Sequence, residues 1–311
     1  MTTAEPLTEV TSPPPSLFEL LVCPACHGDL ALGPTEARCR CGIRYEVDGG
    51  IPLLLVAPSD LSRRQADWFD EQADDEWEIE RPHGAPALHR WLLEEKFRRA
   101  VEGVELRGAT VLTICAGSGM DAEFLARAGA NVVALDVSPG AARRANERAR
   151  RHGFELLAVV GDAASLPFRD RSVDVVHVHD GLHHLDDPLA GLTEMARVAR
   201  SAVCVSEPAR AGITALAVRA GLALEREEAG NRVGRLDAET VNAALRDRGF
   251  SIRTSRRYAM YYRHEPGRVV RLLSHRGLFE AATSSFKLAN AAAGDFGNKL
   301  AVVAVRRGAE S

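Results

Sequence analysis

Five short, mainly apolar runs recur between residues 110 and 207, and each ends in small or acidic residues. They cover residues 111–114, 131–135, 156–160, 173–179 and 202–206. Runs of this length are typical of strands buried on both faces of a parallel sheet, and the stretches between them are long enough for crossover helices. The pattern predicts a doubly wound α/β fold whose strand ends meet at one edge of the sheet.

The rest of the chain predicts two more strands and several helices. We expect helices near residues 210–226 and 237–248, a sixth strand over 250–262, a helix over 267–282 and a seventh strand over 298–305. Residues 263–297 then form an insertion before the last strand. Charge-rich helices are expected over residues 60–105, with six apolar side chains in buried or covering positions: Trp68, Phe69, Trp77, Trp91, Leu92 and Phe97.

The residues that follow the first three runs indicate a nucleotide cofactor. Small side chains from Cys115 to Gly119 let backbone N–H groups approach a ligand, and a helix is expected to start near Met120 or Asp121. Asp136 comes about 20 residues after this loop, where a carboxylate can accept both hydroxyls of an adenosine ribose. Asp162 ends the third run, where it suits an adenine amino group.

Four motifs together resemble the class I S-adenosylmethionine-dependent methyltransferases over about residues 60–311: CAGSG, LD at 135–136, GDAASLPF and VDVVHVHDGLHHLDDP. The resemblance implies a seven-stranded Rossmann-like methyltransferase sheet over residues 106–311 and a helical linker or lid over 58–105. It also implies a set of cofactor-binding residues: Cys115, Ala116, Gly117 and Gly119 for the methionine part, Asp136 and Val137 for the ribose, Asp162 and Ala163 for the adenine, and His179 nearby.

Two positions depart from the methyltransferase pattern. The family usually has an acidic residue where Thr113 stands and a glycine where Cys115 stands, so contacts to the amino group of the cofactor are expected to differ. A nicotinamide enzyme is the rival interpretation of such a loop. The chain lacks the third glycine of the G-x-G-x-x-G fingerprint, which disfavours that rival.

The first fifty residues carry a separate metal-binding pattern. Cys23 and Cys26 are followed, after a gap of twelve residues, by Cys39 and Cys41. Four thiols in a short, turn-rich segment predict a tetrahedral structural zinc site, because the segment is too small to bury a core and metal binding can supply the folding energy. His27 is a substitute ligand for the unusual C-x-C half. Two disulfides or free thiols are the alternatives, and the absence of a secretory signal disfavours disulfides.

The same segment resembles a zinc-ribbon family that includes activator subunits of RNA and protein methyltransferases. The motifs that carry this resemblance are LLVCPACHGDLAL and CRCGIRYEVDGGIPLLL. A zinc ribbon over residues 17–57 is therefore expected, preceded by a flexible N-terminus over residues 1–16.

Methyl transfer from a sulfonium requires an aligned acceptor and, for some acceptors, a base. His183 and His184 follow the fourth strand, where the methyl group is expected to emerge, and they are the candidate catalytic residues. A scaffold role is the alternative for both, and it is the favoured one for His184. Glu207 and Arg235 are weaker candidates for contact with the acceptor.

Two arginine-rich stretches have competing interpretations. Residues 256–264 place tyrosines beside arginines, which suits base stacking or an anionic pocket, and equally suits a strand with one wet face. A helix near residues 141–151 carries five arginines that predict a solvated face: Arg143, Arg144, Arg148, Arg150 and Arg151.

Net charge and hydropathy indicate whether the chain binds nucleic acid, a membrane or a small molecule. The chain has 311 residues, 46% of them hydrophobic, and a formal net charge of −4, so it lacks the overall basic field of a protein that holds nucleic acid by its phosphates. No apolar stretch has membrane-spanning length, so we expect no membrane partner. The absence of a targeting segment and the unpaired cysteines predict a cytoplasmic protein. A small-molecule acceptor, such as a secondary metabolite or a lipid-linked precursor, is favoured; RNA is the second candidate because of the ribbon. A regulatory or partner-docking protein is the alternative of another class. The acceptor atom and the oligomeric state are not predicted.

Overall fold

The computed structural model describes residues 15–72, 75–210, 236–260, 264–293 and 296–308. The five predicted parallel strands are present as β5 (Thr110–Ile114), β6 (Asn131–Asp136), β7 (Leu157–Gly161), β8 (Val173–His179) and β9 (Ala199–Pro208). Their order in the sheet is β7-β6-β5-β8-β9, so the direction of winding reverses between β5 and β8. Ligands of doubly wound folds bind at such a reversal. The predicted doubly wound α/β fold is confirmed.

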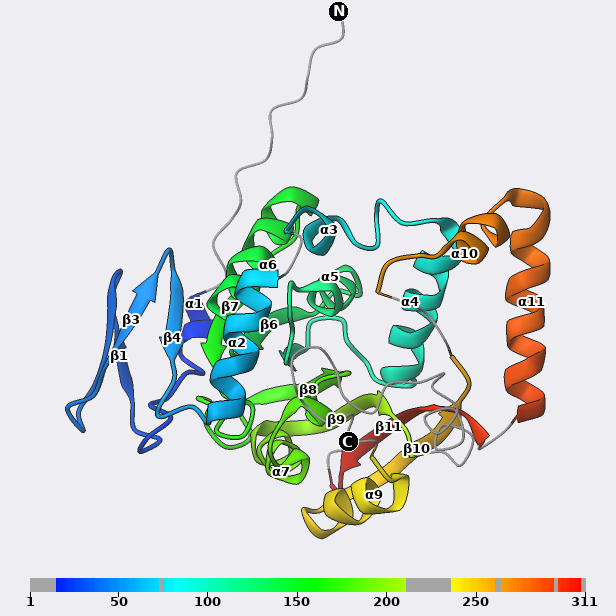
Figure 1. Cartoon of the computed structure of the whole chain (residues 1–311). Coiled ribbons are helices and arrows are strands. Elements are labelled where there is room, and N and C mark those ends of the chain that lie inside the picture. Colours follow the sequence, from blue (N-terminus) through cyan, green and yellow to red (C-terminus); the bar gives the residue numbers. More distant parts are fainter. Residues whose placement is uncertain (1–14, 73–74, 211–235, 261–263, 294–295, 309–311) are drawn as a thin grey trace, which may run out of the picture.

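Helices cover both faces of this sheet (Figure 1). On one face, α5 (Met120–Arg127) and α6 (Pro139–His152) pack with α4 (Ala87–Ala100) around Leu125 and Phe97. On the other face, α7 (Pro188–Val198) and α9 (Ala238–Asp247) pack around Met195 and Leu245. The strands are consequently buried on both sides, as their continuous apolar runs require.

The C-terminal part extends the sheet with two antiparallel strands. β11 (Lys299–Arg306) pairs with β9, and β10 (Phe250–Tyr258) pairs with β11. The insertion between them forms two helices where the sequence predicts one, α10 (Arg268–Leu273) and α11 (Arg276–Ala293), because the first helix ends at Ser274. The helix predicted near residues 210–226 lies outside the described residues.

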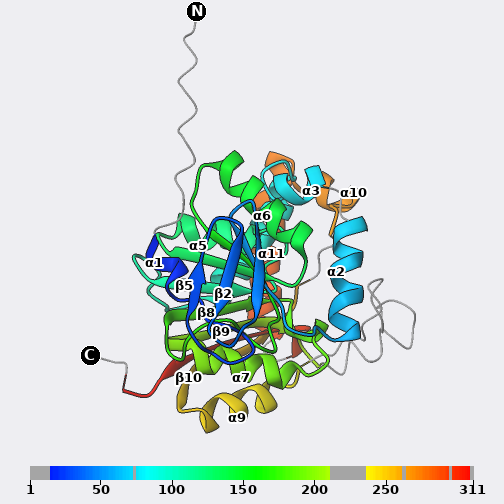
Figure 2. The ribbon, with the colours of Figure 1, turned by 90° about the vertical axis from the view of Figure 1, so that its left-hand side faces the viewer.

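Within residues 106–311 the described chain forms seven strands of the sheet, β5 to β11, as the resemblance implies, and four N-terminal strands extend the same sheet to eleven. The four additional strands are β1 (Leu30–Leu32), β2 (Glu36–Cys39), β3 (Arg44–Asp48) and β4 (Ile51–Leu54). They follow a short helix, α1 (Pro15–Phe18), and form an antiparallel meander on the side of the molecule that faces the viewer in Figure 2. β4 runs parallel to β7 and covers its free edge, since Leu53 pairs with Val160 and Leu54 with Gly161. The N-terminal segment is thereby joined directly to the main sheet.

Three helices lie in the described part of residues 60–105, as predicted: α2 (Asp60–Gln72), α3 (Asp75–Glu80) and α4. Among the six apolar side chains expected to be buried or covering, Leu92 and Phe97 are buried, whereas Trp68, Phe69, Trp77 and Trp91 are partly exposed. Asp70 fixes α2 to the N-terminus of α6, because its Oδ1 accepts hydrogen bonds from the Ser138 hydroxyl and from the Gly140 amide. This contact holds α2 beside the carboxyl edge of the strands.

Candidate active site

A cavity of about 100 Å³ lies at the carboxyl ends of β5, β6 and β7 and opens to solvent. Seven of the predicted site residues line it: Cys115, Gly117, Asp136, Val137, Asp162, Ala163 and His184. Ser62, Gln65 and Phe69 of α2 form another part of the wall. Phe69 is one of the covering side chains expected from the sequence, whereas Ser62 and Gln65 carried no local signal.

The loop after β5 presents backbone amides because three of its residues adopt left-handed conformations. The φ angles are 50° at Cys115, 52° at Gly117 and 79° at Gly119. The Gly117 amide donates to Asp136 Oδ2 at 2.8 Å, and the Ser138 amide donates to Asp136 Oδ1 at 3.0 Å. These two hydrogen bonds fix the orientation of the carboxylate at the cavity wall. Burial raises the pKa of Asp136, although the backbone donors oppose that effect.

Two of the predicted loop residues are not in the cavity wall. Gly119 starts α5, and a Cβ added there would lie 3.0 Å from the Cβ of Ala145, so this glycine permits close packing of the loop on α6. The Ala116 amide donates to the carbonyl of Leu135 at 3.0 Å and ties the loop to β6. Ala116 and Gly119 therefore fix the conformation of the loop without lining the cavity.

Gly181 is a residue of this site that sequence reasoning did not single out. A Cβ added to it would overlap with the Cβ of Cys115 and lie 3.0 Å from the Cys115 Sγ. The loop after β8 thus packs directly on the loop after β5. Burial raises the pKa of the Cys115 thiol well above its usual value, so this cysteine is a packing residue in its neutral form.

His179 lies behind the cavity and does not line it. Its Nδ1 is 2.8 Å from Asp121 Oδ2, at the start of α5. Burial alone would raise the pKa of Asp121, but the facing His179 outweighs it and lowers that pKa to about 2. Conversely, burial opposes the charge on His179, and Asp121 raises the pKa of the ring above its usual value. The pair links β8 to α5 beneath the cofactor loop.

The two candidate catalytic histidines occupy different environments. His183 is buried, and its Nδ1 lies 2.7 Å from Glu207 Oε2, whereas His184 lines the cavity. Gln65 donates to the backbone carbonyl of His184 at 3.0 Å, and Phe69 meets its ring edge to face at 6.2 Å. The imidazole of His184 is therefore placed by α2, and that of His183 by β9.

A buried group of charges lies next to the cavity and includes two lysines that sequence reasoning missed. Lys96 of α4 is fully buried and donates to Asp180 Oδ2, while Lys299 of β11 reaches Asp180 Oδ1 at 3.1 Å and Oδ2 at 2.9 Å. Burial would raise the pKa of Asp180, but the two lysines hold it well below its usual value. Because Asp180 lines the cavity, the site keeps one ionised carboxylate there.

Thr113, where the methyltransferase pattern usually has an acidic residue, faces the core. Its Oγ1 lies 3.2 Å from Nδ1 of His177, its register partner on β8. Burial lowers the pKa of His177 to about 4, so the ring is neutral and shares a hydrogen bond with the hydroxyl. A threonine suits this apolar surrounding, and the described cavity wall does not include it.

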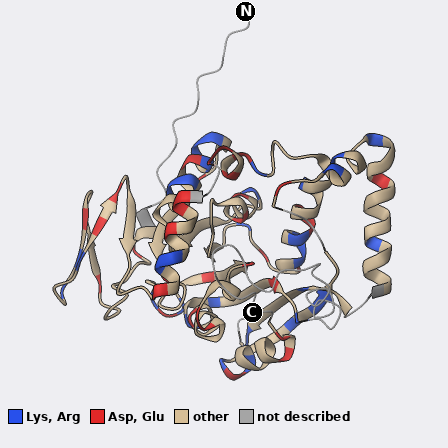
Figure 3. Ribbon diagram, in the orientation of Figure 1, with Lys and Arg blue, Asp and Glu red and all other residues tan. Residues whose placement is uncertain are grey.

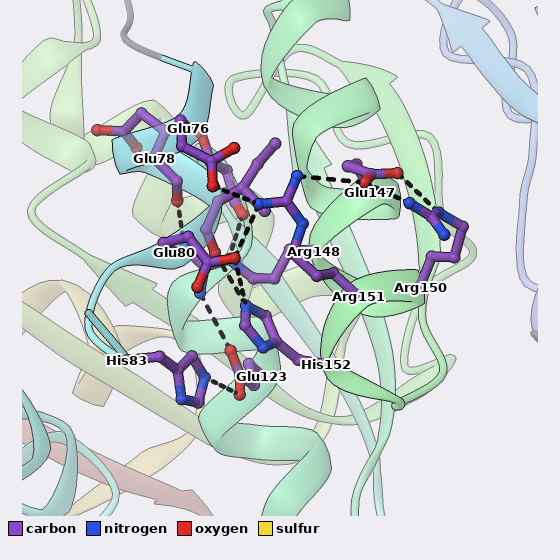
Figure 4. Close-up of polar contacts among 12 residues, drawn as sticks. Glu76, Glu78, Glu80, His83, Glu123, Glu147, Arg148, Arg150, Arg151 and His152 are labelled. Atoms are coloured by element: carbon purple, nitrogen blue, oxygen red, sulfur yellow. Dashed lines mark hydrogen bonds and ion pairs between the residues drawn. The ribbon is translucent and has the colours of Figure 1, made fainter. Parts of the chain in front are cut away.

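The arginine-rich helix α6 is not simply a solvated face, so that prediction is wrong for Arg144 and Arg148, which are both buried. Figure 4 shows the polar contacts around Arg148. Arg148 donates to Glu123 Oε2 at 3.0 Å and to the Ser118 carbonyl at 2.8 Å. Arg144 donates to the Ser118 hydroxyl at 3.1 Å and to the Phe69 carbonyl at 2.9 Å. The two guanidinium groups connect the loop from Cys115 to Gly119 to the helices of the 58–105 segment. Arg150 and Arg143 remain exposed, as predicted.

The four N-terminal cysteines converge on one point. Their Sγ atoms all lie within 4.8 Å of one another, with Cys23 and Cys41 separated by 3.8 Å and Cys26 and Cys39 by 3.5 Å. Four ligands at a Zn–S distance of about 2.3 Å in a tetrahedron have sulfurs about 3.8 Å apart. The separations are far longer than a disulfide bond of about 2.05 Å. This donor set fits a tetrahedral metal ion.

A second group of metal-ligating side chains consists of His83, Glu123 and His152, whose ligand atoms also lie within 4.8 Å of one another. Here Glu123 Oε1 already accepts from Arg127 at 2.7 Å, and its Oε2 accepts from Arg148. Because two guanidinium groups already neutralise the Glu123 carboxylate, this group of side chains repels a metal cation. The group is an ion-pair network that fastens residue 83 to α5.

The arginine and tyrosine cluster near the end of β10 is only partly described. Tyr258 is buried, so the interpretation that it stacks on nucleic-acid bases is wrong. Arg256 pairs with Glu102 at 3.1 Å, and exposed and covered positions alternate along β10, as expected of a strand with one wet face. Three other members of the cluster, Tyr261, Tyr262 and Arg263, lie outside the described residues, as does the candidate Arg235.

Comparison with known proteins agrees with this geometry. Residues 112–204 match the family described as "Methyltransferase domain". The demethylmenaquinone methyltransferase of Renibacterium salmoninarum is 41% identical over 93 residues, which are 30% of this chain and 38% of that protein. The Corynebacterium efficiens enzyme of the same name is 39% identical over 104 residues, 33% of this chain and 43% of that protein. The chain thus spans about two fifths of the length of these curated relatives.

A solved structure matches over a larger part of the chain. Magnesium protoporphyrin IX methyltransferase from Synechocystis PCC 6803 with bound SAH has a TM-score of 0.55 at 19% identity, covering 79% of this chain and 100% of that one. At this identity the likeness concerns the fold. The chain therefore has a Rossmann-like methyltransferase fold.

Proposed function

We propose that this chain transfers a methyl group from S-adenosylmethionine to a small-molecule acceptor, such as a lipid-linked quinone precursor. The observation that carries the proposal is the carboxylate of Asp136, which Gly117 and Ser138 orient at the wall of a cavity that Asp162 also lines. The match of residues 112–204 to a methyltransferase domain supports the reaction class. The similarity to proteins named demethylmenaquinone methyltransferase supports an acceptor that carries a lipid chain.

The residues of the cavity fit an adenosyl cofactor. Asp136 offers two carboxylate oxygens for a ribose diol, while Asp162 accepts from the Ala164 amide at 2.8 Å through Oδ1 and keeps Oδ2 for an adenine amino group. Val137 and Ala163 supply apolar contacts for the base, and the amides of the loop from Cys115 to Gly119 suit the methionine part. When bound, the sulfonium supplies a methyl group that is already activated.

The protein's own contribution is alignment, exclusion of water and placement of polar groups. Phe69 and Gln65 of α2 cover the cavity, so α2 serves as the lid of the 58–105 segment. Asp180, kept ionised by Lys96 and Lys299, accepts a hydrogen bond from a hydroxyl of the acceptor. His184 is the cavity-lining imidazole and takes up a proton at a ring nitrogen when the acceptor releases one. His183, bound to Glu207, positions the loop that carries His184.

We further propose that residues 17–57 form a zinc ribbon in which Cys23, Cys26, Cys39 and Cys41 hold one structural Zn²⁺. The Sγ separations of 3.8 Å between Cys23 and Cys41 and 3.5 Å between Cys26 and Cys39 support this assignment. Metal analysis is expected to find one zinc per chain, and a strong chelator is expected to increase amide exchange across β1–β3 while β5–β9 stay protected. Metal-free protein with unchanged exchange in β1–β3 contradicts the proposal.

The reaction is tested by incubating zinc-replete protein and methyl-labelled cofactor with separate extracts of small molecules, lipids, RNA and protein. Label is expected in the organic-soluble fraction. Label confined to RNA supports the second candidate, an RNA methyltransferase that uses the ribbon as its docking module. Cofactor binding with no label in any fraction supports a regulatory protein and contradicts the proposed activity.

A further inference from the structure

Exposed large apolar side chains concentrate on the insertion before the last strand. Val269 and Leu272 of α10 are 68% and 58% exposed, Leu278 and Leu288 of α11 are 42% and 71% exposed, and Phe296 just beyond is 83% exposed. Elsewhere in the described residues only Val56 and Leu189 are comparable. Single exposed apolar residues are ordinary, but a group of five on one segment marks an interaction surface.

These side chains are not a displaced part of the core, because the opposite side of the same helices is packed. Val270, Leu273, Phe279 and Phe286 contact a buried cluster with Leu92 of α4. Polar contacts fix the position further. The Leu88 amide donates to the Ser274 hydroxyl at 3.0 Å, and the Asn290 amide group binds both the N–H and the carbonyl of Ala259 at 2.8 and 3.0 Å. The exposed apolar side chains therefore lie on the solvent side of α10 and α11, opposite the side that packs on the protein.

The same surface is basic in a chain whose net charge is −4. The described residues 264–293 include Arg268, Arg271, Arg276 and Lys287 against Glu265 and Glu280, so the segment carries a net positive charge. None of these three arginines forms an ion pair with a carboxylate of the described chain, and Arg271 donates instead to the Pro266 carbonyl at 3.2 Å. Figure 3 shows blue segments on α10 and at the start of α11, then a red and a further blue segment on α11, whose remaining length is uncharged.

We propose that α10 and α11 form a docking surface for an anionic lipid bilayer. Exposed leucine, valine and phenylalanine side chains interspersed with arginines suit a helix that lies in the interface between headgroups and acyl chains. A second copy of the chain fits less well, because a two-fold contact through this face brings like-charged arginines together. RNA offers phosphates for the arginines but no apolar surface for side chains as exposed as Phe296 and Leu288.

A bilayer-docking surface differs from the expectation of no membrane partner. Hydropathy predicts no membrane partner, but it detects only spanning segments, and a helix that lies on a bilayer does not have that signature. In the described part of the chain, no helix has the length and apolar character needed to cross a membrane. The docking surface is argued from exposure and charge alone; only its purpose, access to a lipid-linked acceptor, rests on the proposed function.

The proposal is tested by co-sedimentation of the full chain with vesicles of phosphatidylcholine alone or with about one third phosphatidylglycerol. Binding is expected only to the anionic vesicles and is expected to weaken as salt increases. The triple variant R268Q/R271Q/R276Q is expected to bind about 100-fold more weakly, and the variant L272S/L288S is expected to lose most of its binding. Absence of sedimentation of the unmodified protein with anionic vesicles overturns the proposal.

Matched variants separate this surface from general effects. R38Q/R44Q/R246Q removes three exposed arginines from other faces, and V56S/L189S removes the two exposed apolar side chains elsewhere. Both are expected to sediment like the unmodified protein, and equal losses in them overturn the proposal. Calorimetric binding of S-adenosylhomocysteine without lipid is measured on every variant, so that failure of the cofactor site is distinguished from failure of the docking surface. A dimer that L272S/L288S dissociates, with no vesicle binding, identifies the face as a contact between copies and rejects the bilayer.

Discussion

Glu207 and His183 form a fully buried pair in which Oε2 of the carboxylate lies 2.7 Å from Nδ1 of the imidazole. The other oxygen, Oε1, accepts from the amides of Gly181 and Leu182, both at 2.7 Å. Burial would raise the pKa of Glu207, but the facing His183 outweighs it and holds that pKa below its usual value. One carboxylate of β9 thus fixes the loop that carries Asp180 and His184.

Replacing Glu207 with glutamine tests this role of the carboxylate. The amide keeps one acceptor for the two backbone donors but loses the charge that attracts His183, so the free energy of unfolding is expected to fall by about 2 kcal/mol. Cofactor affinity is expected to fall as well, because the loop packs on Cys115. Thermal unfolding and calorimetry measure the two effects. A Glu207→Gln protein as stable as the unmodified one shows that the loop is held by other contacts.

Gly181→Ala tests the packing of the two loops at the cofactor site. The added methyl group overlaps with Cys115, so the loop after β5 must shift, and affinity for S-adenosylhomocysteine is expected to fall at least tenfold. Gly84→Ala is the matched control, since nothing lies within 4 Å of the Cβ added there. The double variant C115G/G181A removes the obstructing side chain and is expected to recover part of the affinity. No recovery means that the contact with Val178, not Cys115, is decisive.

Two arginines on the same helix distinguish a buried ion pair from an exposed one. Arg148→Met leaves Glu123 buried without one of its partners, and the free energy of unfolding is expected to fall by about 3 kcal/mol. Arg150→Gln removes an exposed pair with Glu147 and is expected to leave stability unchanged. Denaturant unfolding of both variants gives the comparison. Similar stability for the two proteins contradicts the structural role assigned to Arg148.

His177 is expected to make the stability depend on pH between pH 6.5 and about 4. Burial lowers its pKa to about 4 in the folded chain, so within this window the unfolded chain binds a proton that the folded chain does not. The contribution of the neutral His177 ring to the free energy of unfolding is therefore fully present above pH 6.5. It is lost as the pH falls toward 4, by about 1 kcal/mol per pH unit. His177→Asn retains a hydrogen-bonding group for Thr113 without titrating. Its unfolding free energy should have a shallower slope in this window, and an equal slope refutes the assignment.

Much of the fold could be predicted from the sequence because the strands are continuous apolar runs. β5, β6 and β8 lie within one residue of the predicted bounds, and the loop from Cys115 to Gly119 lies where the small residues indicate. Local composition is sufficient for such elements, because each strand is buried on both faces. The cysteine spacing similarly predicts a cluster of thiols that the structure brings together.

The parts that could not be predicted depend on contacts between segments far apart in the chain. Arg148 looks like a surface residue in its own helix, and it is buried only because α3 covers it and offers the Glu78 carbonyl. Lys96 belongs to a charged helix, and its partner Asp180 lies 84 residues away. β4 was missed as part of the main sheet because its parallel pairing with β7 has no local signature. Burial of charge is a property of tertiary packing, which a single sequence does not display.

Calorimetric titration of zinc-replete protein with S-adenosylmethionine and its demethylated product tests the central claim most directly. The account predicts one site per chain and at least a tenfold loss of affinity for Asp136→Asn and for Asp162→Asn, because each loses a carboxylate that accepts from the adenosine. Asp170→Asn, an exposed control, is expected to bind normally. Folded protein that binds neither compound, or aspartate variants that bind as well as the unmodified chain, would contradict the account.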